Sequence, residues 1–441
     1  MIMSHQTFNT IIHARWLLTV ESSEILQHHS VAIKDGQIAA ISPTNETSDW
    51  AADEVITLDE HVLMPGLINL HGHSAMTLLR GYADDLQLMD WLHNHIWPAE
   101  GKHVDDAFVY EGSLIGMAEM IRSGTTTIND MYFYHRAVAR AGAEAGMRTF
   151  VGCSILEFPT NYAQNADEYI SKAMVEREEY LNNELITFTL APHAPYTVSD
   201  ETFKKITDIA LKNDMLVHCH IHETMDEVND SVRDHGKRPL ARLNDIGFLE
   251  NKLIAAHMVH LTDDEIALTA SKNISIAHNP NSNMKLASGI APIAQAMAAG
   301  VNVGIGTDGA ASNNKLDMLN ETRQAALLAK VGTLNPTDVP AFQAIQMATI
   351  NGAKALHMVG KTGSIKVGKQ ADIIAINMAA LETVPTFDVI SHIVYAAGRE
   401  HVTHTWVNGQ CLMKQRQLLT LDETALKAMA KKWQTRIESS R

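Results

Sequence analysis

The sequence predicts an α/β fold: a (β/α)8 TIM-like barrel with a small β-sandwich domain built from both chain ends. Two observations lead to this prediction. Hairpin signals of similar form stand near the two ends of the chain. Between them, apolar and β-prone runs alternate with stretches of helical spacing, at 62–70, 125–132, 148–156, 186–192, 215–221, 253–259, 274–278 and 301–307. No glycine-rich dinucleotide fingerprint follows the first runs, which weighs against an open doubly wound sheet.

The two chain ends predict short antiparallel strands. Residues 31–41 form two apolar segments around Asp35-Gly36, and residues 405–412 have the same form around Asn408-Gly409. Such dipeptides favour hairpins because the tight turn needs positive φ. Residues 366–376 are expected to rejoin these strands. We therefore assign residues 1–61 and 366–441 to the small domain and 62–365 to the barrel, with a surface helix at about 422–440.

The predicted barrel helices lie between the apolar runs. Residues 109–121 are one example, with apolar positions at helical spacing. Glycines at positions 124, 146 and 300 stand where helices are expected to end, as glycine tolerates the left-handed conformation that often terminates a helix.

Composition limits the possible partners and location. The 441-residue chain has a formal net charge of −16, which argues against a nucleic-acid backbone or an anionic membrane surface as the main partner. Its three cysteines, Cys153, Cys219 and Cys411, lie in apolar runs and predict buried thiols in a reducing compartment. We find no signal peptide and no apolar run of the ~20 residues that a membrane span requires, so we expect a cytoplasmic protein.

Polar residues stand at the ends of nearly all the predicted strands, where barrel enzymes carry their chemistry. His71 and His73 point to the same face, ~7 Å apart along the chain, because side chains alternate in a strand. The others stand within or just after later runs: His193, then His218, His220 and His222, then His257 and His260, then His278, and Asp308. A lone histidine is more often a core or surface residue, but this repetition predicts a shared site.

The residue types suit a divalent metal ion. His218, His220 and His222 have the same parity, so the period alone does not choose among them; His218 is expected in the core and His222 at the surface. His220 would stand beside Glu223. Asp308, an acid at the end of a buried strand, is costly unless paired or coordinated. Imidazoles with one carboxylate favour zinc, with iron as the alternative. A two-metal site would need a bridging ligand, usually a modified lysine, and residues 185–191 contain no lysine.

Several motifs resemble those of the amidohydrolase superfamily and, within it, the 5-methylthioadenosine/S-adenosylhomocysteine deaminase family. They span nearly the whole chain: Pro65 to His73, Leu79-Arg80-Gly81, Trp91-Leu92, His193 to Tyr196, His220 to Thr224, His278 to Asn283, and Gly306 to Asn314. The resemblance implies one metal ion held by His71, His73, His220 and Asp308. It implies substrate contacts from Glu100, Arg148, His193, Glu223, Asp308 and Ser312, and a homo-oligomer, either a dimer or a tetramer.

The expected reaction is hydrolytic deamination of an adenine nucleoside thioether with release of ammonia. 5′-Methylthioadenosine would give 5′-methylthioinosine, and S-adenosylhomocysteine is a possible second substrate. A metal lowers the pKa of a bound water toward ~7. Asp308 would accept the proton of this water, Glu223 would protonate purine N1, and His257 would orient the attacking hydroxide.

Two features bear on the rest of the substrate. Glu100 either accepts hydrogen bonds from both ribose hydroxyls or is an ordinary carboxylate at a helix start. Some relatives carry a second arginine after the third strand, which would meet the carboxylate of a homocysteine tail, but residues 157–165 contain none. This absence favours the neutral methylthio tail. Met76, Met89 or Met131 would line a pocket for the thioether.

Two other readings remain open. The same scaffold can support deamination of guanine or another base, or hydrolysis of a triazine, and neither substrate carries a ribose for Glu100. A metal-free structural relative would have lost some of the metal ligands, whereas the full set is present here.

Overall fold

Eight parallel strands form the predicted barrel. The computed structural model describes residues 6–440, and its barrel sheet runs in the order β12-β11-β10-β9-β8-β7-β6-β5. The strands are β5 (Leu67–Gly72), β6 (Thr125–Tyr132), β7 (Arg148–Ile155), β8 (Ile186–Pro192), β9 (Leu216–Ile221), β10 (Lys252–His257), β11 (Ser275–His278) and β12 (Asn302–Ile305). Beyond β12, the backbone N–H of Asp308 donates to the carbonyl of His71 at 2.9 Å, which brings the last strand end back to the first. The fold class predicted from the sequence is confirmed.

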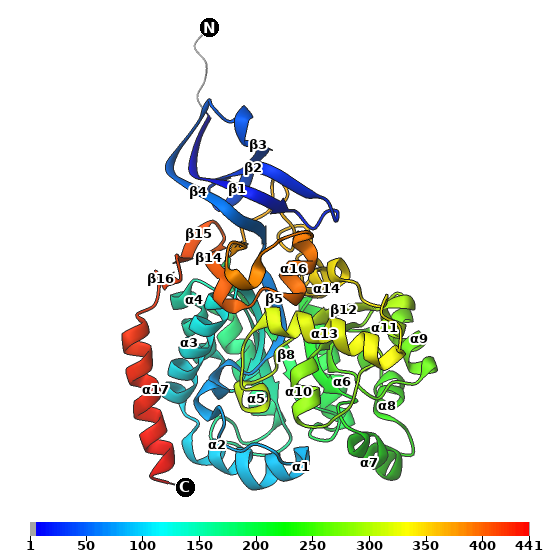
Figure 1. Ribbon diagram of the computed structural model, residues 1–441. Helices are drawn as coiled ribbons and strands as arrows, with labels where there is room; N and C mark the ends of the chain where they lie inside the picture. Colours follow the sequence, from blue (N-terminus) through cyan, green and yellow to red (C-terminus); the bar gives the residue numbers. More distant parts are fainter. Residues whose placement is uncertain (1–5, 441) are drawn as a thin grey trace.

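Helices surround this barrel (Figure 1). They are α1 (Leu88–Asp90), α2 (Trp97–His103), α3 (Asp106–Arg122), α4 (His135–Ala145), α5 (Ala166–Glu178), α6 (Asp200–Asn213), α7 (Met225–His235), α8 (Pro239–Asp245), α9 (Asp263–Ser271), α10 (Pro280–Lys285), α11 (Ile293–Ala298), α12 (Ala310–Asn313), α13 (Met318–Thr333), α14 (Ala341–Met347), α15 (Ile350–Ala355), α16 (Val389–Tyr395) and α17 (Glu423–Glu438).

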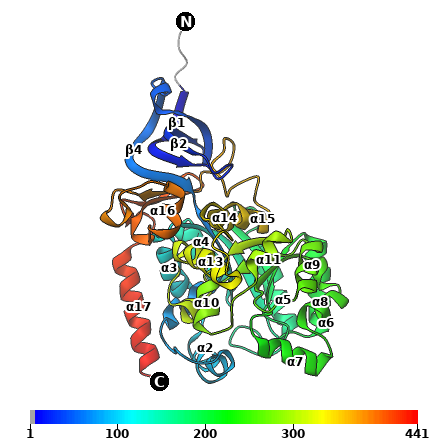
Figure 2. The ribbon, with the colours of Figure 1, turned by 45° about the vertical axis from the view of Figure 1, so that its right-hand side comes forward.

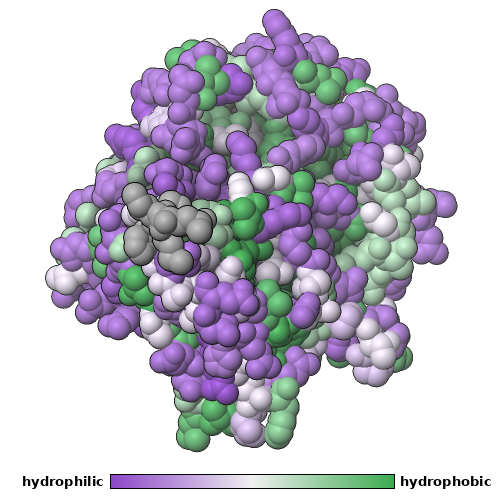
Figure 3. Space-filling model, turned by 90° about the horizontal axis from the view of Figure 1, so that it is seen from above, coloured by the Kyte–Doolittle hydropathy of each residue, from purple (hydrophilic) through white to green (hydrophobic). Residues whose placement is uncertain are grey.

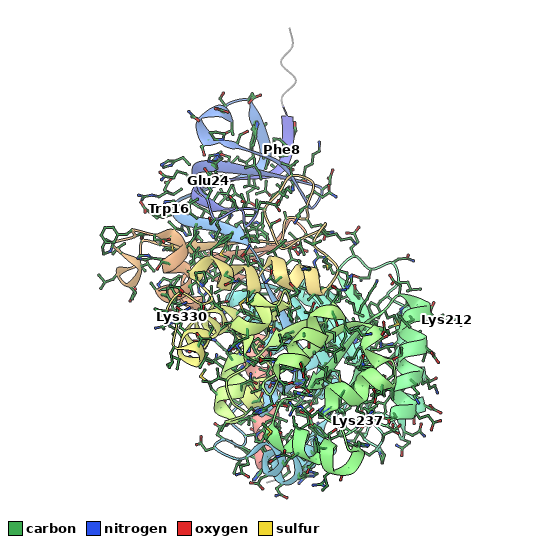
Figure 4. The ribbon with its side chains drawn as sticks, turned by 90° about the vertical axis from the view of Figure 1, so that its right-hand side faces the viewer. Phe8, Trp16, Glu24, Lys212, Lys237 and Lys330 are labelled. Atoms are coloured by element: carbon green, nitrogen blue, oxygen red, sulfur yellow. The ribbon has the colours of Figure 1, made fainter. Side chains whose placement is uncertain are left out.

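Helix α6 illustrates why these segments are helical. Phe203, Ile206 and Ala210 recur at helical spacing and are buried, whereas Lys212 is exposed and points away from the barrel (Figure 4). The side chain of Ser199 caps the first turn by accepting the N–H of Thr202.

The predicted first run, 62–70, is divided between two sheets. Strand β4 (Trp50–Pro65) continues to Pro65 and pairs with β1 (Gln6–Leu18) and β13 (Ile373–Asn377), and the barrel begins at Leu67. Gly66 joins them because a Cβ atom there would lie 2.2 Å from the side chain of Thr126. The first barrel strand therefore begins five residues after the boundary that we expected at residue 62.

Strands from both chain ends form the second sheet, as predicted. Its order is β16-β15-β14-β13-β4-β1-β2-β3. The remaining strands are β2 (Ile25–Lys34), β3 (Gln37–Pro43), β14 (Val402–Val407), β15 (Gln410–Lys414) and β16 (Gln417–Leu418). The hairpins turn at Asp35-Gly36 and Asn408-Gly409, which all have positive φ. Buried residues from both ends, among them Ile12 and Trp406, pack into one cluster.

Helix α15 closes the amino-terminal end of the barrel. Gly352 lies against Ile68 of β5, at 2.8 Å from the position of an added Cβ, and Ala353 and Leu356 join the cluster inside the barrel. The second sheet lies at this end of the molecule, whereas α1, α2 and α7 lie at the other (Figures 1 and 2). Helix α17 runs along the side of the barrel, as the expected surface helix, and near its end Ser440 contacts His103 of α2.

Seen from the end that carries the second sheet, the surface is mainly hydrophilic with apolar patches between (Figure 3). Cys153 and Cys219 are buried and all three cysteines are free thiols. No helix within residues 6–440 is both long enough and apolar enough to cross a membrane.

Candidate active site and metal centre

A cavity of about 580 Å³ opens at the carboxyl ends of the barrel strands. Polar residues that the sequence analysis singled out line it: His73, Glu100, His193, His220, Glu223, His257, Asp308 and Ser312. Three residues at the strand ends, His222, His257 and Asp308, have positive φ, at 57°, 73° and 61°. Non-glycine residues in this conformation cluster at functional sites, where the surrounding structure holds them in place.

The four predicted metal ligands fall into two groups that share His71: His71 with His73 and Asp308, and His71 with His220 and His257. Nε2 of His71 and Nε2 of His73 lie 3.3 and 3.2 Å from Oδ1 of Asp308. Two ligands each ~2.0–2.1 Å from a tetrahedral ion are themselves ~3.3 Å apart, so this spacing fits zinc. The ring of His220 lies 4.7 Å from that of His71 and stacks on His73 at 5.5 Å.

Each of the three imidazoles is oriented through its Nδ1 atom. Nδ1 of His73 lies 2.6 Å from the carbonyl of Met131, and Nδ1 of His220 lies 2.7 Å from the carbonyl of His193. Nδ1 of His71 lies 3.0 Å from His218. All three Nε2 atoms therefore face the centre, and buried Nε2 of His71 has no hydrogen-bond partner among the described residues. The residues present fit a divalent ion.

The electrostatics of the cluster also favour a cation. Burial lowers the pKa of His71 to about 4 and keeps that of His220 well below its usual value, so both rings are neutral ligands. Burial also lowers the pKa of His73, but the Asp308 carboxylate outweighs it and raises the pKa to about 9. Burial raises the pKa of Asp308, but the hydrogen bonds and charges of His71 and His73 outweigh burial. The pKa of Asp308 therefore lies well below its usual value. The ionised Asp308 carboxylate thus favours a positive charge beside it, at the place where a metal ion would bind.

Asp308 is held in one orientation by hydroxyl groups. Ser282 and Ser312 both donate to Oδ2, at 2.6 and 2.7 Å, and the N–H of Gly309 donates to Oδ1 at 2.7 Å. Ser312, predicted as a substrate contact, thus lines the cavity and also binds Asp308.

Glu223 and His257 face each other at the cavity wall. Nε2 of His257 lies 3.7 Å from Oε2 of Glu223, and Nδ1 of His257 lies 2.8 Å from Oδ1 of Asn283. Burial raises the pKa of Glu223, although the charge of His257 opposes the rise. Burial therefore favours the protonated carboxyl that a general acid requires.

The sequence analysis missed the residue that holds Glu223. The carboxylate of Glu227 accepts the backbone N–H groups of His222 and Glu223, at 2.9 and 2.8 Å. Its signal in the sequence was the spacing Thr224-x-x-Glu227 at the start of α7, which is typical of a helix N-terminus.

Glu100 and His193 occupy other parts of the wall. Tyr132, at the end of β6, donates a 2.6 Å hydrogen bond to Oε1 of Glu100. Nδ1 of His193 lies 3.0 Å from the hydroxyl of Thr197. Burial lowers the pKa of His193 to about 3, so its ring is neutral.

Arg148 does not reach the cavity, so the predicted substrate contact is wrong. It begins β7, at the amino end of the barrel, and its guanidinium binds both carboxylate oxygens of Asp372 at 2.9 and 3.1 Å. It also donates to the carbonyl of Glu184. The first residue of a parallel strand lies at the end opposite the catalytic residues, so Arg148 ties the barrel to the second sheet.

The other histidines of β9 differ from one another. His218 is 1 % exposed, which confirms the predicted core position. The expectation that His222 lies at the surface is wrong, because its side chain is completely buried. Strand β9 ends at Ile221, and the positive φ of His222 turns its ring into the molecule. There it lies 2.9 Å from the carbonyl of His260 and accepts the N–H of Leu240.

The rest of the cavity wall is mostly aromatic and apolar, with a few uncharged polar residues: Ser154, Thr160, Asn161 and Gln164. It includes Trp91, Trp97, Tyr134, Phe158 and Tyr162, with Met76 and Met131 of the three methionines we considered. No arginine or lysine lies among the described residues that line the cavity.

Comparisons with known proteins agree with this geometry. The model of the Amidohydrolase family matches residues 62–412. A 5-methylthioadenosine/S-adenosylhomocysteine deaminase of Saccharophagus degradans is 43 % identical over 433 residues, covering 98 % of this chain and 97 % of that protein. A 5′-deoxyadenosine deaminase of Methanosarcina barkeri is 43 % identical over 423 residues, covering 96 % of each.

A solved structure is similar over the same length. It is a zinc-bound adenosine deaminase from Xanthomonas campestris, with a TM-score of 0.97 and 43 % identity, covering 98 % of this chain and 99 % of that one. The superfamily resemblance drawn from the motifs is thus confirmed, and the chain belongs to the amidohydrolase family.

Proposed function

We propose that the protein is a metal-dependent aminohydrolase that deaminates adenine nucleosides carrying a small, neutral 5′ substituent, with 5′-methylthioadenosine as the preferred substrate. The observation that carries this proposal is the content of one cavity. It brings together two groups of metal-ligating side chains that share His71, a Glu223 carboxyl whose pKa is raised by burial, and a Glu100 carboxylate available for ribose. The deaminase names of the full-length relatives support the same reaction.

The chain's own residues account for the proton transfers. When bound, a divalent ion supplies the Lewis acidity that makes water a nucleophile near neutral pH. Asp308 accepts a proton from the attacking water through Oδ1, while its Oδ2 stays bound to two serine hydroxyls. Glu223 gives its proton to purine N1, which makes C6 electrophilic. Water thus adds at C6, and Asp308 passes the proton that it accepted to the C6 amino nitrogen. The C6–N bond then breaks and releases ammonia, while the C6 hydroxyl returns a proton to Glu223, which leaves the inosine-like product and restores both carboxyl groups.

The chemistry of the wall supports a neutral tail. A carboxylate moved from water into a cavity without a cationic partner loses hydration that nothing replaces. Aromatic residues such as Trp97 and Phe158 suit a methylthio or methyl group instead. S-Adenosylhomocysteine is therefore the poorer of the two predicted substrates.

A screen of ammonia release tests the proposal. We expect the highest kcat/KM with 5′-methylthioadenosine, lower values with adenosine and S-adenosylhomocysteine, and no turnover of guanine. Fastest turnover of guanine or a triazine would overturn the nucleoside assignment. Fastest turnover of S-adenosylhomocysteine would leave the reaction intact and reject the neutral tail.

The assembly is proposed on resemblance alone, and the cytoplasmic location on the three cysteines in apolar runs. We expect a homodimer or homotetramer in the cytoplasm, and light scattering of the purified protein measures the first of these properties.

A further inference from the structure

Glu321 is a completely buried acid outside the cavity. It lies in the first turn of α13, and the groups that face its carboxylate are all donors. Oε2 accepts the backbone N–H of Asn281 at 3.2 Å, and Oε1 accepts the side-chain amide of Asn281 and that of Asn313, the latter at 2.7 Å. Burial, with the charge of Asp317, raises the pKa of Glu321 to about 8, although these donors oppose the rise. Both carboxyl oxygens therefore act as acceptors for nitrogen donors from the two asparagines.

The two asparagines belong to different strand ends. Asn281 lies in α10, which follows β11, and Asn313 ends α12, which follows β12. Helices α10 and α13 lie side by side (Figures 1 and 2). The second hydrogen of the Asn313 amide goes to the carbonyl of Thr307, at 2.6 Å. Glu321 therefore joins two segments that the chain separates by about thirty residues.

Each asparagine is adjacent to a serine that binds Asp308. Ser282 follows Asn281, and Ser312 precedes Asn313. Their hydroxyls meet at one atom, Oδ2 of Asp308. Oδ1, which also accepts the N–H of Gly309, faces the imidazole cluster and lies 3.3 and 3.2 Å from His71 and His73. A shift of either segment would release one hydroxyl and let the carboxylate turn.

We propose that Glu321 is a positioning residue for the metal centre: by holding Asn281 and Asn313 together, it sets both serines on one oxygen of Asp308 and so aims the other at the metal. A buried acid is a costly way to fill space, since an apolar side chain would pack there without desolvation of a polar group. The proposal rests on metal-dependent hydrolysis at this site but not on the identity of the nucleoside.

The test measures zinc affinity by competition with a chelator, without substrate, next to kcat and KM for 5′-methylthioadenosine. Glu321→Gln turns one acceptor into a donor that faces other donors. We expect zinc affinity and kcat to fall by ~10-fold each, within the range for residues that orient metal ligands, with KM unchanged. Because the affinity is measured without substrate, a wrong nucleoside assignment would leave this result intact.

Asp317→Ala is the matched control. Asp317 caps the same helix by accepting the N–H of Asn320 and does not contact either asparagine. Its loss should lower the unfolding temperature while zinc affinity and kcat stay at wild-type values. Equal losses in both variants would show that α13 acts only through stability, and the proposal would be wrong.

A double-mutant cycle with Ser312→Ala tests whether Glu321 acts on the metal centre through the serines. If Glu321 acts through the serines, the losses in zinc affinity from Glu321→Gln and Ser312→Ala should not multiply in the double variant. Independent, multiplying losses would overturn the proposal, as would wild-type affinity in Glu321→Gln. If that variant does not fold, Asn313→Ala removes the same tether from its other end, with the same expected loss.

Discussion

The hydroxyl of Tyr132 donates a 2.6 Å hydrogen bond to Oε1 of Glu100, joining the end of β6 to α2 within the cavity wall. Burial raises the pKa of Glu100, and the bond from Tyr132 lowers it. Tyr132 thus favours the ionised carboxylate and fixes its direction, both of which a ribose-binding acceptor needs.

We expect Tyr132→Phe to lower kcat/KM for 5′-methylthioadenosine by ~10-fold or more, since a hydrogen bond to a charged group contributes ~1.5–3 kcal/mol. Glu100→Ala should cost more, ~2–4 kcal/mol, because it removes the bidentate contact to the ribose hydroxyls. Steady-state kinetics with the nucleoside and with free adenine measure both. Adenine has no ribose, so equal losses for the two substrates would mean that the pair supports the wall only structurally.

Glu223→Gln keeps the shape of the side chain but removes the transferable proton. We expect kcat to fall by ~10²-fold or more, the usual contribution of a general acid–base. Metal analysis of the same sample should find the ion retained, because Glu223 is outside the predicted ligand set. Turnover close to wild type would exclude Glu223 from the proton transfers.

The metal centre predicts a stoichiometry. We expect His71, His73, His220 and Asp308 to hold one ion, so active protein should contain about one divalent ion per chain, with zinc expected first. Removal by a chelator should abolish activity, and added zinc should restore it. Two tightly bound ions, or full activity in metal-free protein, would contradict this prediction.

Glu227 predicts a pH dependence of stability. Burial raises its pKa from 4.5 to about 7, although the N–H groups of His222 and Glu223 oppose the rise. The folded protein therefore holds this proton to a higher pH than the unfolded chain does. The resulting stability is fully present below pH 4.5 and is lost as the pH rises through about 7.

The glutamine of the Glu227→Gln variant cannot ionise. Between about pH 5 and about pH 8, the free energy of unfolding should therefore fall less in this variant than in the wild type, and the difference should be ~1–3 kcal/mol. Chemical denaturation at the two pH values measures this difference, and the other titrating groups contribute equally to both proteins. Parallel pH profiles would show that Glu227 is ionised throughout.

Arg148 should affect stability and not catalysis. Arg148→Met leaves the buried Asp372 carboxylate without its cation, which costs ~3–5 kcal/mol for a buried pair. The backbone N–H of Asn408 and the hydroxyl of Thr362 still donate to Asp372, which favours the lower part of that range. Denaturant titration should show the loss, with kcat and KM unchanged in the folded protein. A raised KM would restore Arg148 as a substrate contact.

The sequence by itself determined the alternation of strands and helices and the ends at which polar residues gather. Each strand carries its own apolar run, and the hairpins at Asp35-Gly36 and Asn408-Gly409 carry their own turn residues, so these features are local. His71 and His73 share a face for the same reason, because alternation in a strand is a property of the backbone. The division at Gly66 was not visible, because it depends on a close approach to Thr126.

Only the tertiary structure decided how these local elements are used. Parity could not separate His218, His220 and His222, whose surroundings come from β5, β8 and the segment around His260. The buried pairs Arg148–Asp372 and Tyr132–Glu100 each join residues far apart in the chain. The partners of Glu321 likewise come from two other segments. Periodicity reports which face a side chain occupies, whereas its chemistry depends on the groups that packing brings to that face.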